Sequence, residues 1–437
     1  MKPLSVDQIN EALPELDELR PVLDHVLALS APDPARTWTA SGELGTVGER
    51  LVDVEALEGS ADALADGMRE HLSALFREII VAVGALARDE RGTAAAALVR
   101  AAELEEEAGR LARAEACALA AHRLARGLKE QGSAALALRR AARAARGRGK
   151  LQLSLERYGD AYEIARDSFQ GRAAAEAAIG AGNVLEQQGG WDLAEKWYRR
   201  ALGSLESVDG PVPERWHATL NIHITLRSRG RIEESEPWLD EAESVAASIE
   251  DASARPYLEN ARGQLLMARG DFERAGRRLR EALAASEDPM ARVTVRLNLA
   301  ETLLARGRSL DAAEEVREAE REAVAGPVVP KLPEVYRLLG RIAAAEGNRE
   351  AFVLFERAIR IVRERGLPPF EEALTLQAYA EFEEGRGEEE TAQELRARAM
   401  EIYDMLGIEH ARSRWADLFR DPGSGERDAP EERRSDG

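Results

Sequence analysis

The chain has 437 residues, enough for two or three ordinary domains or for one long repeat array. Its 80 acidic residues against 60 Lys and Arg give a net charge of -20, which repels nucleic-acid phosphates and anionic lipid, so neither is an expected partner. A single cysteine, Cys117, excludes an intrachain disulfide. Aromatic residues make up only 5%, whereas Ala, Leu, Glu and Arg dominate, which favours helices.

Residues 1–50 are predicted to form an irregular segment with a short helix and a loop rich in Pro, Gly, Ser and Thr. Residues 51–89 are predicted to be a helical N-terminal cap or a degenerate repeat, with an apolar stripe from Leu72 to Leu86 at a 3.6-residue period. This stripe is expected to pack on the first repeat or, if exposed, to make a homo-oligomer interface. No signal-peptide pattern or membrane-spanning stretch is present, so we expect a cytoplasmic protein without a membrane partner.

Eight repeats follow in residues 90–406, each marked by a glycine that recurs about every forty residues. The series is Gly109, Gly149, Gly189, Gly230, Gly270, Gly307, Gly347 and Gly387. Small residues stand five and twelve positions after most of these glycines, and a mostly small residue stands seven positions before. A fixed period of this size indicates a solenoid. Each repeat is predicted to be two helices joined by a turn in which the glycine adopts the left-handed conformation.

Two units carry a pattern that resembles the tetratricopeptide repeat family. One consists of Gly182, Leu185, Gly189, Trp191, Ala194, Tyr198 and Ala201, and the other of Gly263, Leu266, Gly270, Phe272, Ala275, Leu279 and Ala282. The unit length is about 40 residues rather than the usual 34, as in long-unit bacterial regulators and adaptors. The resemblance implies an all-α fold, a right-handed superhelical solenoid of antiparallel helix pairs with eight or nine units. Residues 407–420 are then expected to be a C-terminal capping helix, and residues 421–437 a disordered tail.

Solenoids usually hold other molecules, so we expect a non-enzymatic scaffold or adaptor that binds a protein or peptide of unknown identity in its concave groove. The six histidines are scattered, and no His or Cys pair has metal-ligand spacing, so no catalytic residue, metal or cofactor is expected. Two alternatives stay open. The chain is a stand-alone ligand-sensing arm of a signalling or transcription regulator, or it is an assembly subunit of a larger complex.

An asparagine recurs in the first helix of four consecutive units, nearly at the repeat period. The four are Asn183, Asn221, Asn260 and Asn298. In the resembled family the first helix lines the concave groove, and an amide side chain offers both a donor and an acceptor to a peptide backbone. Nearby side chains that would read the ligand are His217, Tyr257, Gln264, Arg337 and Arg341. The alternative is that the asparagines bond to the neighbouring helix or face water.

A basic segment spans residues 121–150, with nine Lys or Arg against one glutamate. Its central arginines are Arg139, Arg140, Arg143 and Arg146. The functional interpretation is a docking patch for an acidic partner or for a second copy of the chain. The alternative is a solvated, arginine-rich helix pair without a partner.

Overall fold

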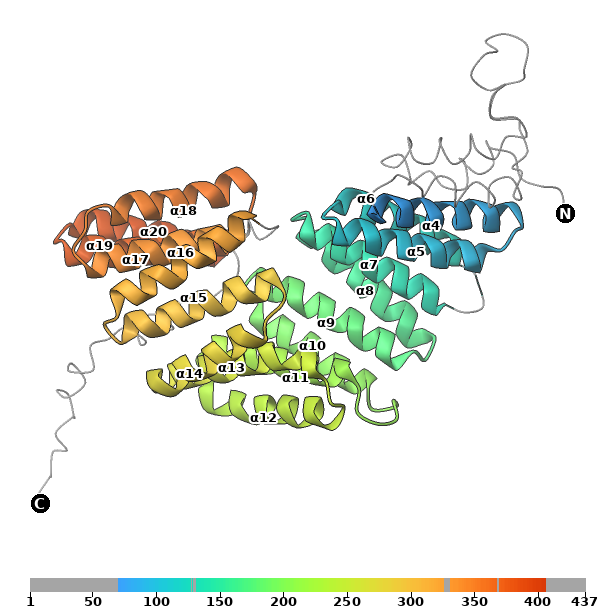
Figure 1. Cartoon of the computed structure of the whole chain (residues 1–437), viewed down its shortest axis with the longest axis horizontal. Coiled ribbons are helices and arrows are strands. Elements are labelled where there is room, and N and C mark those ends of the chain that lie inside the picture. The colour runs from blue at the N-terminus through green and yellow to red at the C-terminus, as the bar shows by residue number, and fades with distance from the viewer. Residues whose placement is uncertain (1–69, 127, 129–130, 326–330, 368, 406–437) are drawn as a thin grey trace, which may run out of the picture.

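A computed structural model describes residues 70–126, 128, 131–325, 331–367 and 369–405. These residues form 17 α-helices, each of which packs antiparallel against the next (Figure 1). In chain order the helices are α4 (Glu70–Ala87), α5 (Arg91–Glu107), α6 (Leu111–Ala125), α7 (Gly132–Gly147), α8 (Leu151–Asp167), α9 (Gly171–Gln187), α10 (Trp191–Ser204), α11 (Pro213–Ser228), α12 (Ile232–Ser248), the 3₁₀ helix η3 (Ala252–Ala254), α13 (Arg255–Ala268), α14 (Phe272–Ala285), α15 (Pro289–Ala305), α16 (Ser309–Ala325), α17 (Leu332–Ala345), α18 (Ala351–Arg365), α19 (Pro369–Gly385) and α20 (Glu389–Met405). The predicted all-α solenoid of antiparallel helix pairs is confirmed.

All eight recurring glycines adopt a positive φ, between 68° and 80°. Each lies in the turn between the two helices of one unit, from α5–α6 to α19–α20. The turn at Gly189 is representative, because the N–H of the next residue, Gly190, donates to the carbonyl of Leu185 at 2.8 Å and closes the end of α9. A side chain with a Cβ is strained in this conformation, which is why glycine recurs at this position.

Glycines seven positions before the turn lie where a second helix presses its largest side chain against the first. A Cβ built on Gly182 would lie 2.4 Å from the Tyr198 ring, and one built on Gly263 would lie 2.8 Å from Leu279 Cγ. The small residues of the repeat therefore let the two helices of a unit approach closely, and Tyr198 and Leu279 are fully buried in return.

Gly340 has the same close neighbour, since a Cβ there would lie 2.6 Å from Cε1 of the buried Phe355 ring. Gly340→Ala should lower the free energy of unfolding by about 1–3 kcal/mol, because the rigid ring must shift. Gly159→Ala is the matched control, since Gly159 lies inside α8 with nothing within 4 Å of a Cβ. That change should raise stability by about 0.5–1 kcal/mol. Urea unfolding of both variants measures the difference, and equal stabilities would contradict the close approach.

The first helices of consecutive units contact one another from α5 through α7, α9 and onward to α19, whereas second helices contact mainly the first helices beside them. The first helices therefore line the inner side of the curved path that the units follow in Figure 1. Before them, α4 packs on α5. Its residues Leu75, Ile79 and Val83 are buried in one core with Ala94 and Leu98 of α5.

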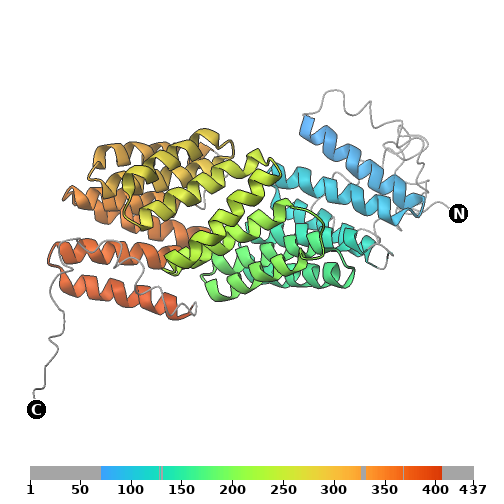
Figure 2. The same cartoon turned by 90° about the horizontal axis from the view of Figure 1, so that it is seen from below.

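The curved path brings the third unit against the eighth. The ring of Trp191, at the start of α10, lies 5.8 Å from that of Phe370 in α19, in an edge-on arrangement. Near this contact, a Cβ built on Gly149 would lie 3.8 Å from the carbonyl oxygen of Gly366. Seen from below in Figure 2, the red C-terminal pair lies beside the green helices from the middle of the chain. The solenoid is thus closed by a contact between units far apart in sequence.

The predictions for residues 1–50, 407–420 and 421–437, and for the first part of 51–89, concern residues outside the described part of the chain. Within the described ranges, none of the helices combines the length and the apolar character that crossing a bilayer requires.

Candidate functional site

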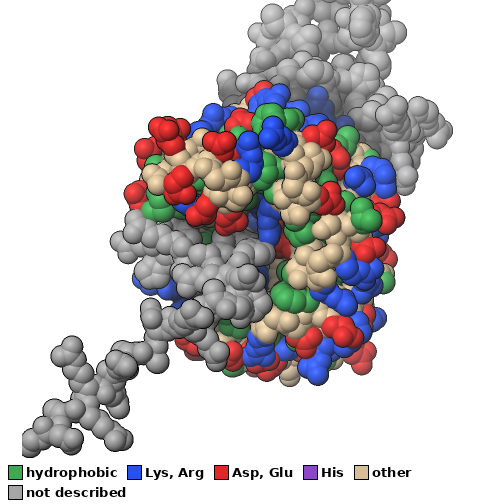
Figure 3. Space-filling view, turned by 90° about the vertical axis from the view of Figure 1, so that its left-hand side faces the viewer, with side chains coloured by type: hydrophobic (Ala, Val, Ile, Leu, Met, Phe, Trp, Pro, Cys, Tyr) green, Lys and Arg blue, Asp and Glu red, His purple; other side chains and the backbone are tan. Residues whose placement is uncertain are grey.

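The residues three, six, ten and thirteen positions before a turn glycine share one face of each first helix, because these spacings correspond to whole turns. We call the surface made by this face in α7, α9, α11, α13, α15, α17 and α19 the concave groove. Figure 3, a view from the C-terminal side, shows a narrow hollow between the units with basic and acidic side chains inside it.

Side-chain hydrogen bonds bridge every junction between successive first helices from α9 to α19. They run from Asn221 Nδ2 to Asn183 Oδ1 (3.1 Å), Arg227 Nη2 to Gln264 Oε1 (2.9 Å), Asn298 Nδ2 to Asn260 Oδ1 (2.8 Å), Arg341 Nη1 to Glu301 Oε1 (2.9 Å) and Arg337 Nη1 to Glu371 Oε2 (2.7 Å). Each is worth about 1 kcal/mol in a partly buried setting. The groove is therefore polar along its length, and its polar groups also hold the units together.

The four asparagines form two separate pairs, Asn183 with Asn221 and Asn260 with Asn298. Asn183 Oδ1 also accepts a hydrogen bond from the hydroxyl of Tyr198 at 2.8 Å. The amide nitrogen of Asn183 and the side-chain oxygen of Asn221 then have no hydrogen-bond partner among the described residues, and both side chains are half-buried. The first pair thus keeps an amide nitrogen and a carbonyl oxygen that are available to another molecule.

The other predicted groove residues divide into two groups. His217 and Tyr257 each stand thirteen positions before the turn glycine of their unit, and both side chains are exposed. The His217 ring stacks on the Trp216 ring, with 3.6 Å between the ring centroids. Arg337 is held by Glu371, whose carboxylate overcomes the effect of burial and raises the pKa of the arginine. Arg341 is likewise held by Glu301. The charges of these two arginines are therefore already balanced within the chain.

The basic segment lies on the same inner face as the asparagines. Arg139 pairs with Glu176 of α9 at 3.1 Å, whereas Arg140 and Arg143 pair with Glu106 of α5. Arg146 has no carboxylate partner among the described residues, and it stands near Tyr158 and Tyr198. Burial raises the pKa of both tyrosines, and the positive charge of Arg146 makes this increase smaller. The arginines of the predicted docking patch therefore lie on the same surface as the concave groove, although the sequence predicted two separate features.

Sequence reasoning missed Arg227, which stands three positions before its turn glycine, as Arg146 and Glu186 do. Burial lowers the pKa of Arg227 to about 10, although the carboxylates of Glu186 and Glu301 oppose this. Neither carboxylate lies within 4.0 Å of the guanidinium, so no ion pair forms. The recurrence of charged residues at this one register position was the signal that pointed to it.

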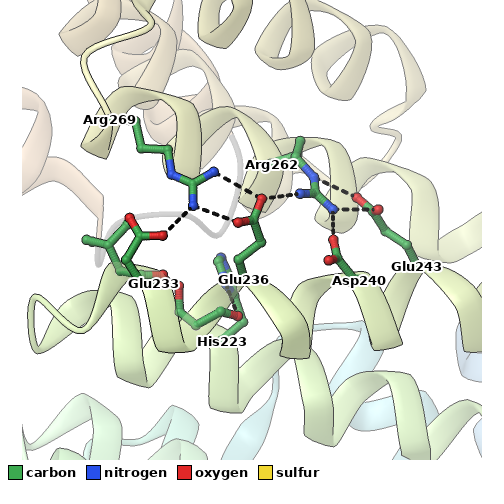
Figure 4. Close-up of polar contacts among 9 residues, drawn as sticks. His223, Glu233, Glu236, Asp240, Glu243, Arg262 and Arg269 are labelled. Atoms are coloured by element: carbon green, nitrogen blue, oxygen red, sulfur yellow. Dashed lines mark hydrogen bonds and ion pairs between the residues drawn. The ribbon is translucent and has the colours of Figure 1, made fainter.

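Arginines on the other side of α13 have abundant partners (Figure 4). Arg262 Nη2 lies 2.7 Å from Asp240 Oδ1 and 2.6 Å from Glu243 Oε2 of α12. Arg269 is bound by Glu236 and Glu233 of the same helix. These contacts raise the pKa of both arginines and fix the junction between the fourth and fifth units.

Cavities occur both in the groove and on the outside of the solenoid. A cavity of about 30 Å³ lies in the groove between α15, α17 and α19, beside Arg337 and Gln377, and has room for a water molecule or two. An open depression of about 650 Å³ lies along α12, α13 and α14 and is lined largely by charged side chains such as Glu243 and Arg255. Within the described ranges, no three His, Cys, Asp or Glu side chains gather in a way that would hold a metal ion.

No family model matches the chain, and no curated protein matches its sequence. Among solved structures, the Rap conjugation gene regulator of the plasmid pLS20 in complex with the Phr* peptide has a TM-score of 0.54 at 14% identity, covering 74% of this chain and 94% of that chain. A Rap protein complexed with Competence and Sporulation Factor has a TM-score of 0.53 at 14% identity, covering 91% and 99%. A tetratricopeptide repeat protein from Parabacteroides merdae is less similar, with a TM-score of 0.44 at 18% identity over 64% and 98%.

At these identities the likeness concerns the fold alone. The chain is therefore structurally similar to these two Rap proteins, as an all-α solenoid of antiparallel helix pairs.

Proposed function

We propose that this chain is a non-enzymatic interaction module that holds an extended peptide, or an extended segment of a protein, in its concave groove. The observation that carries the proposal is the Asn183–Asn221 pair, which keeps the amide nitrogen of Asn183 and the carbonyl oxygen of Asn221 available after its internal bonds. A peptide backbone group needs one acceptor and one donor in return. Such contacts would hold a chain of varied sequence, and neighbouring side chains would supply the selectivity.

Two of the similar structures support this assignment, because one is described in complex with the Phr* peptide and the other in complex with Competence and Sporulation Factor. The proposed partner is a protein or peptide, with no nucleic acid, membrane, metal or cofactor involved. The net charge of -20 is consistent with this choice, since it disfavours phosphate-rich partners. The proposed location is the cytoplasm.

A ligand-sensing regulatory arm is the second candidate. It is favoured by the description of one similar structure as a conjugation gene regulator. Both candidates share binding in the groove and differ in what binding then controls. A homo-oligomeric assembly subunit has less support, because Leu75, Ile79 and Val83 of the N-terminal stripe are buried against α5.

Retention of a random heptapeptide library by immobilised protein, read by mass spectrometry, tests the proposal. The wild type should retain a subset of peptides, and combined Asn183→Ala and Asn221→Ala changes should weaken their binding about tenfold, as expected for the loss of two hydrogen bonds. Gln152→Ala is the control, because Gln152 is exposed on the second helix α8 and bonds only its neighbour Glu156. Circular dichroism must show equal helicity in the three proteins. Failure of the wild type to retain any peptide, or equal retention by the double variant, would reject the proposed role.

A further inference from the structure

Arg227 is a positively charged side chain in the groove that has only a neutral partner. Its Nη2 donates to Gln264 Oε1 at 2.9 Å, and its Nε is buried without an acceptor. An arginine has five N–H donors, so most of those on Arg227 are not engaged. Glu186 of α9 and Glu301 of α15 act on it electrostatically, and both lie beyond the 4.0 Å of an ion pair.

Other arginines of comparable burial do not share this condition. Arg296 and Arg337 have 15% and 14% of their side-chain surface exposed, and each is bonded to at least one glutamate. The pKa of Arg227 shifts in the opposite direction from the pKa values of these two arginines. Their carboxylate partners raise their pKa values, whereas burial lowers the pKa of Arg227. A buried charge without a counter-charge is costly to the fold. Binding of an anion would remove that cost.

Arg146 extends the positive region toward the N-terminal end of the groove. It occupies the same register position as Arg227, two units earlier, and has no carboxylate partner among the described residues. Its charge acts on Tyr198, whose hydroxyl meets Asn183 at 2.8 Å and Glu186 at 2.9 Å. The Asn183–Asn221 pair therefore lies between two arginines that lack carboxylate partners, with Glu186 partly offsetting their charge.

We propose that Arg227, aided by Arg146, binds a carboxylate of the peptide that the groove holds. The inference rests on the proposed function and specifies the ligand, which must carry either an acidic side chain or a free carboxyl terminus at this point. The planar guanidinium suits a carboxylate because two N–H groups meet two oxygens. Arg337 and Arg341, which the sequence predicted to read the ligand, are already occupied by Glu371 and Glu301.

The overall charge of -20 opposes an acidic ligand at long range, but screening limits this repulsion beyond about 8 Å at physiological salt. Inside the groove, the positive charges of Arg227 and Arg146 act at this point, and the carboxylates of Glu186 and Glu301 offset them in part. A ligand with one carboxylate and otherwise neutral or apolar residues suits these conditions better than a highly acidic one.

Four random heptapeptide pools test the inference with the full chain. The pools contain or lack Asp and Glu, and each is made with a free or an amidated carboxyl terminus. Wild-type protein should retain peptides with a carboxylate at least tenfold better than the amidated pool without Asp and Glu. Preference for the amidated acidic pool would identify a side-chain carboxylate, and preference for the free pool without Asp and Glu would identify the terminus.

Arg227→Gln should abolish this preference while leaving residual, charge-independent binding. Arg277→Gln is the control, because Arg277 is exposed on the second helix α14 and is paired with Glu273; it should keep the preference. Arg227→Gln removes a charge that lacks a partner, so the variant is expected to fold, which thermal unfolding checks. Equal retention of all four pools by the wild type, or an unchanged preference in Arg227→Gln, would overturn the inference and leave peptide binding intact. Retention of no pool would instead reject the proposed function itself.

Discussion

Trp191→Ala should open the solenoid and lower its free energy of unfolding by about 3–5 kcal/mol, the cost typical of removing a buried Trp. Trp191 is only 8% exposed, because its ring meets Phe370 at 5.8 Å and 88°. Phe370 in turn lies 6.1 Å from Tyr403, within the core of the last unit. Since this contact joins the third unit to the eighth, no interface between neighbouring units replaces it.

Small-angle X-ray scattering and urea unfolding together measure the effect. Trp191→Ala should increase the radius of gyration and should separate the unfolding of the C-terminal units from that of the rest. Phe272→Ala is the matched control, because Phe272 also stands two residues after a turn glycine yet makes no aromatic ring contact among the described residues. It should leave the radius of gyration unchanged. An unchanged radius in Trp191→Ala would show that the contact does not hold the solenoid closed.

The closing contact matters for the groove because of how solenoids deform. When each unit touches only its neighbours, small rotations at every junction add up, and the curvature is soft. A contact between the third and eighth units fixes the sum of these rotations. The width of the groove is then set in advance, which reduces the ordering that a ligand must impose on the protein.

The repeat itself was predictable because its determinants are local. A positive φ at Gly189 or Gly270 depends on the turn alone, and the close approach of Gly182 to Tyr198 depends on one helix pair. Both leave a spacing that can be counted along the sequence. The contact between the Trp191 and Phe370 rings has no comparable spacing in the sequence, because it depends on the curvature accumulated over five units.

The arrangement of the asparagines was not predictable from their spacing. The four asparagines do not occupy one register position in their helices. They stand six, nine, ten and nine residues before their turn glycines, in the order Asn183, Asn221, Asn260 and Asn298, so their side chains start from different points on the helix face. Because of these different positions, and because neighbouring first helices are offset, the asparagines form two separate pairs and not one continuous row of hydrogen bonds. Arg227 was missed for a related reason: an arginine without a carboxylate partner is recognised only when the positions of the surrounding glutamates are known.

Acidification from pH 6.5 to pH 5 should destabilise the chain by about 2 kcal/mol through His223 alone. This histidine stands where the other units have Gly or Ala, and it is fully buried. Its Nδ1 lies 3.0 Å from the carbonyl oxygen of Ser235 in α12 and donates to it, whereas Nε2 is buried without a partner. Figure 4 shows it close to the contacts of Arg262.

Burial lowers the pKa of His223 to about 4, and the positive charges of Arg227 and Arg262 act in the same direction. At a pH between the pKa of about 6.5 in the unfolded chain and the lower pKa in the folded chain, His223 is protonated in the unfolded chain but stays neutral in the folded chain. His223 therefore has no effect on the free energy of unfolding well above pH 6.5, and below pH 6.5 it lowers this free energy by about 1.4 kcal/mol per pH unit.

Urea unfolding at pH 8.0, 7.0, 6.0 and 5.0 compares the wild type with His223→Ala, which restores the residue found at this position in four other units. The variant loses packing at every pH, so the informative quantity is the slope of stability against pH. Its slope should be shallower than that of the wild type between pH 6.5 and pH 5, and the two curves should run parallel above pH 7. Equal slopes would mean that the imidazole is protonated in the folded chain. In that case the junction of α11, α12 and α13 would have to open enough to solvate a third positive charge beside Arg227 and Arg262.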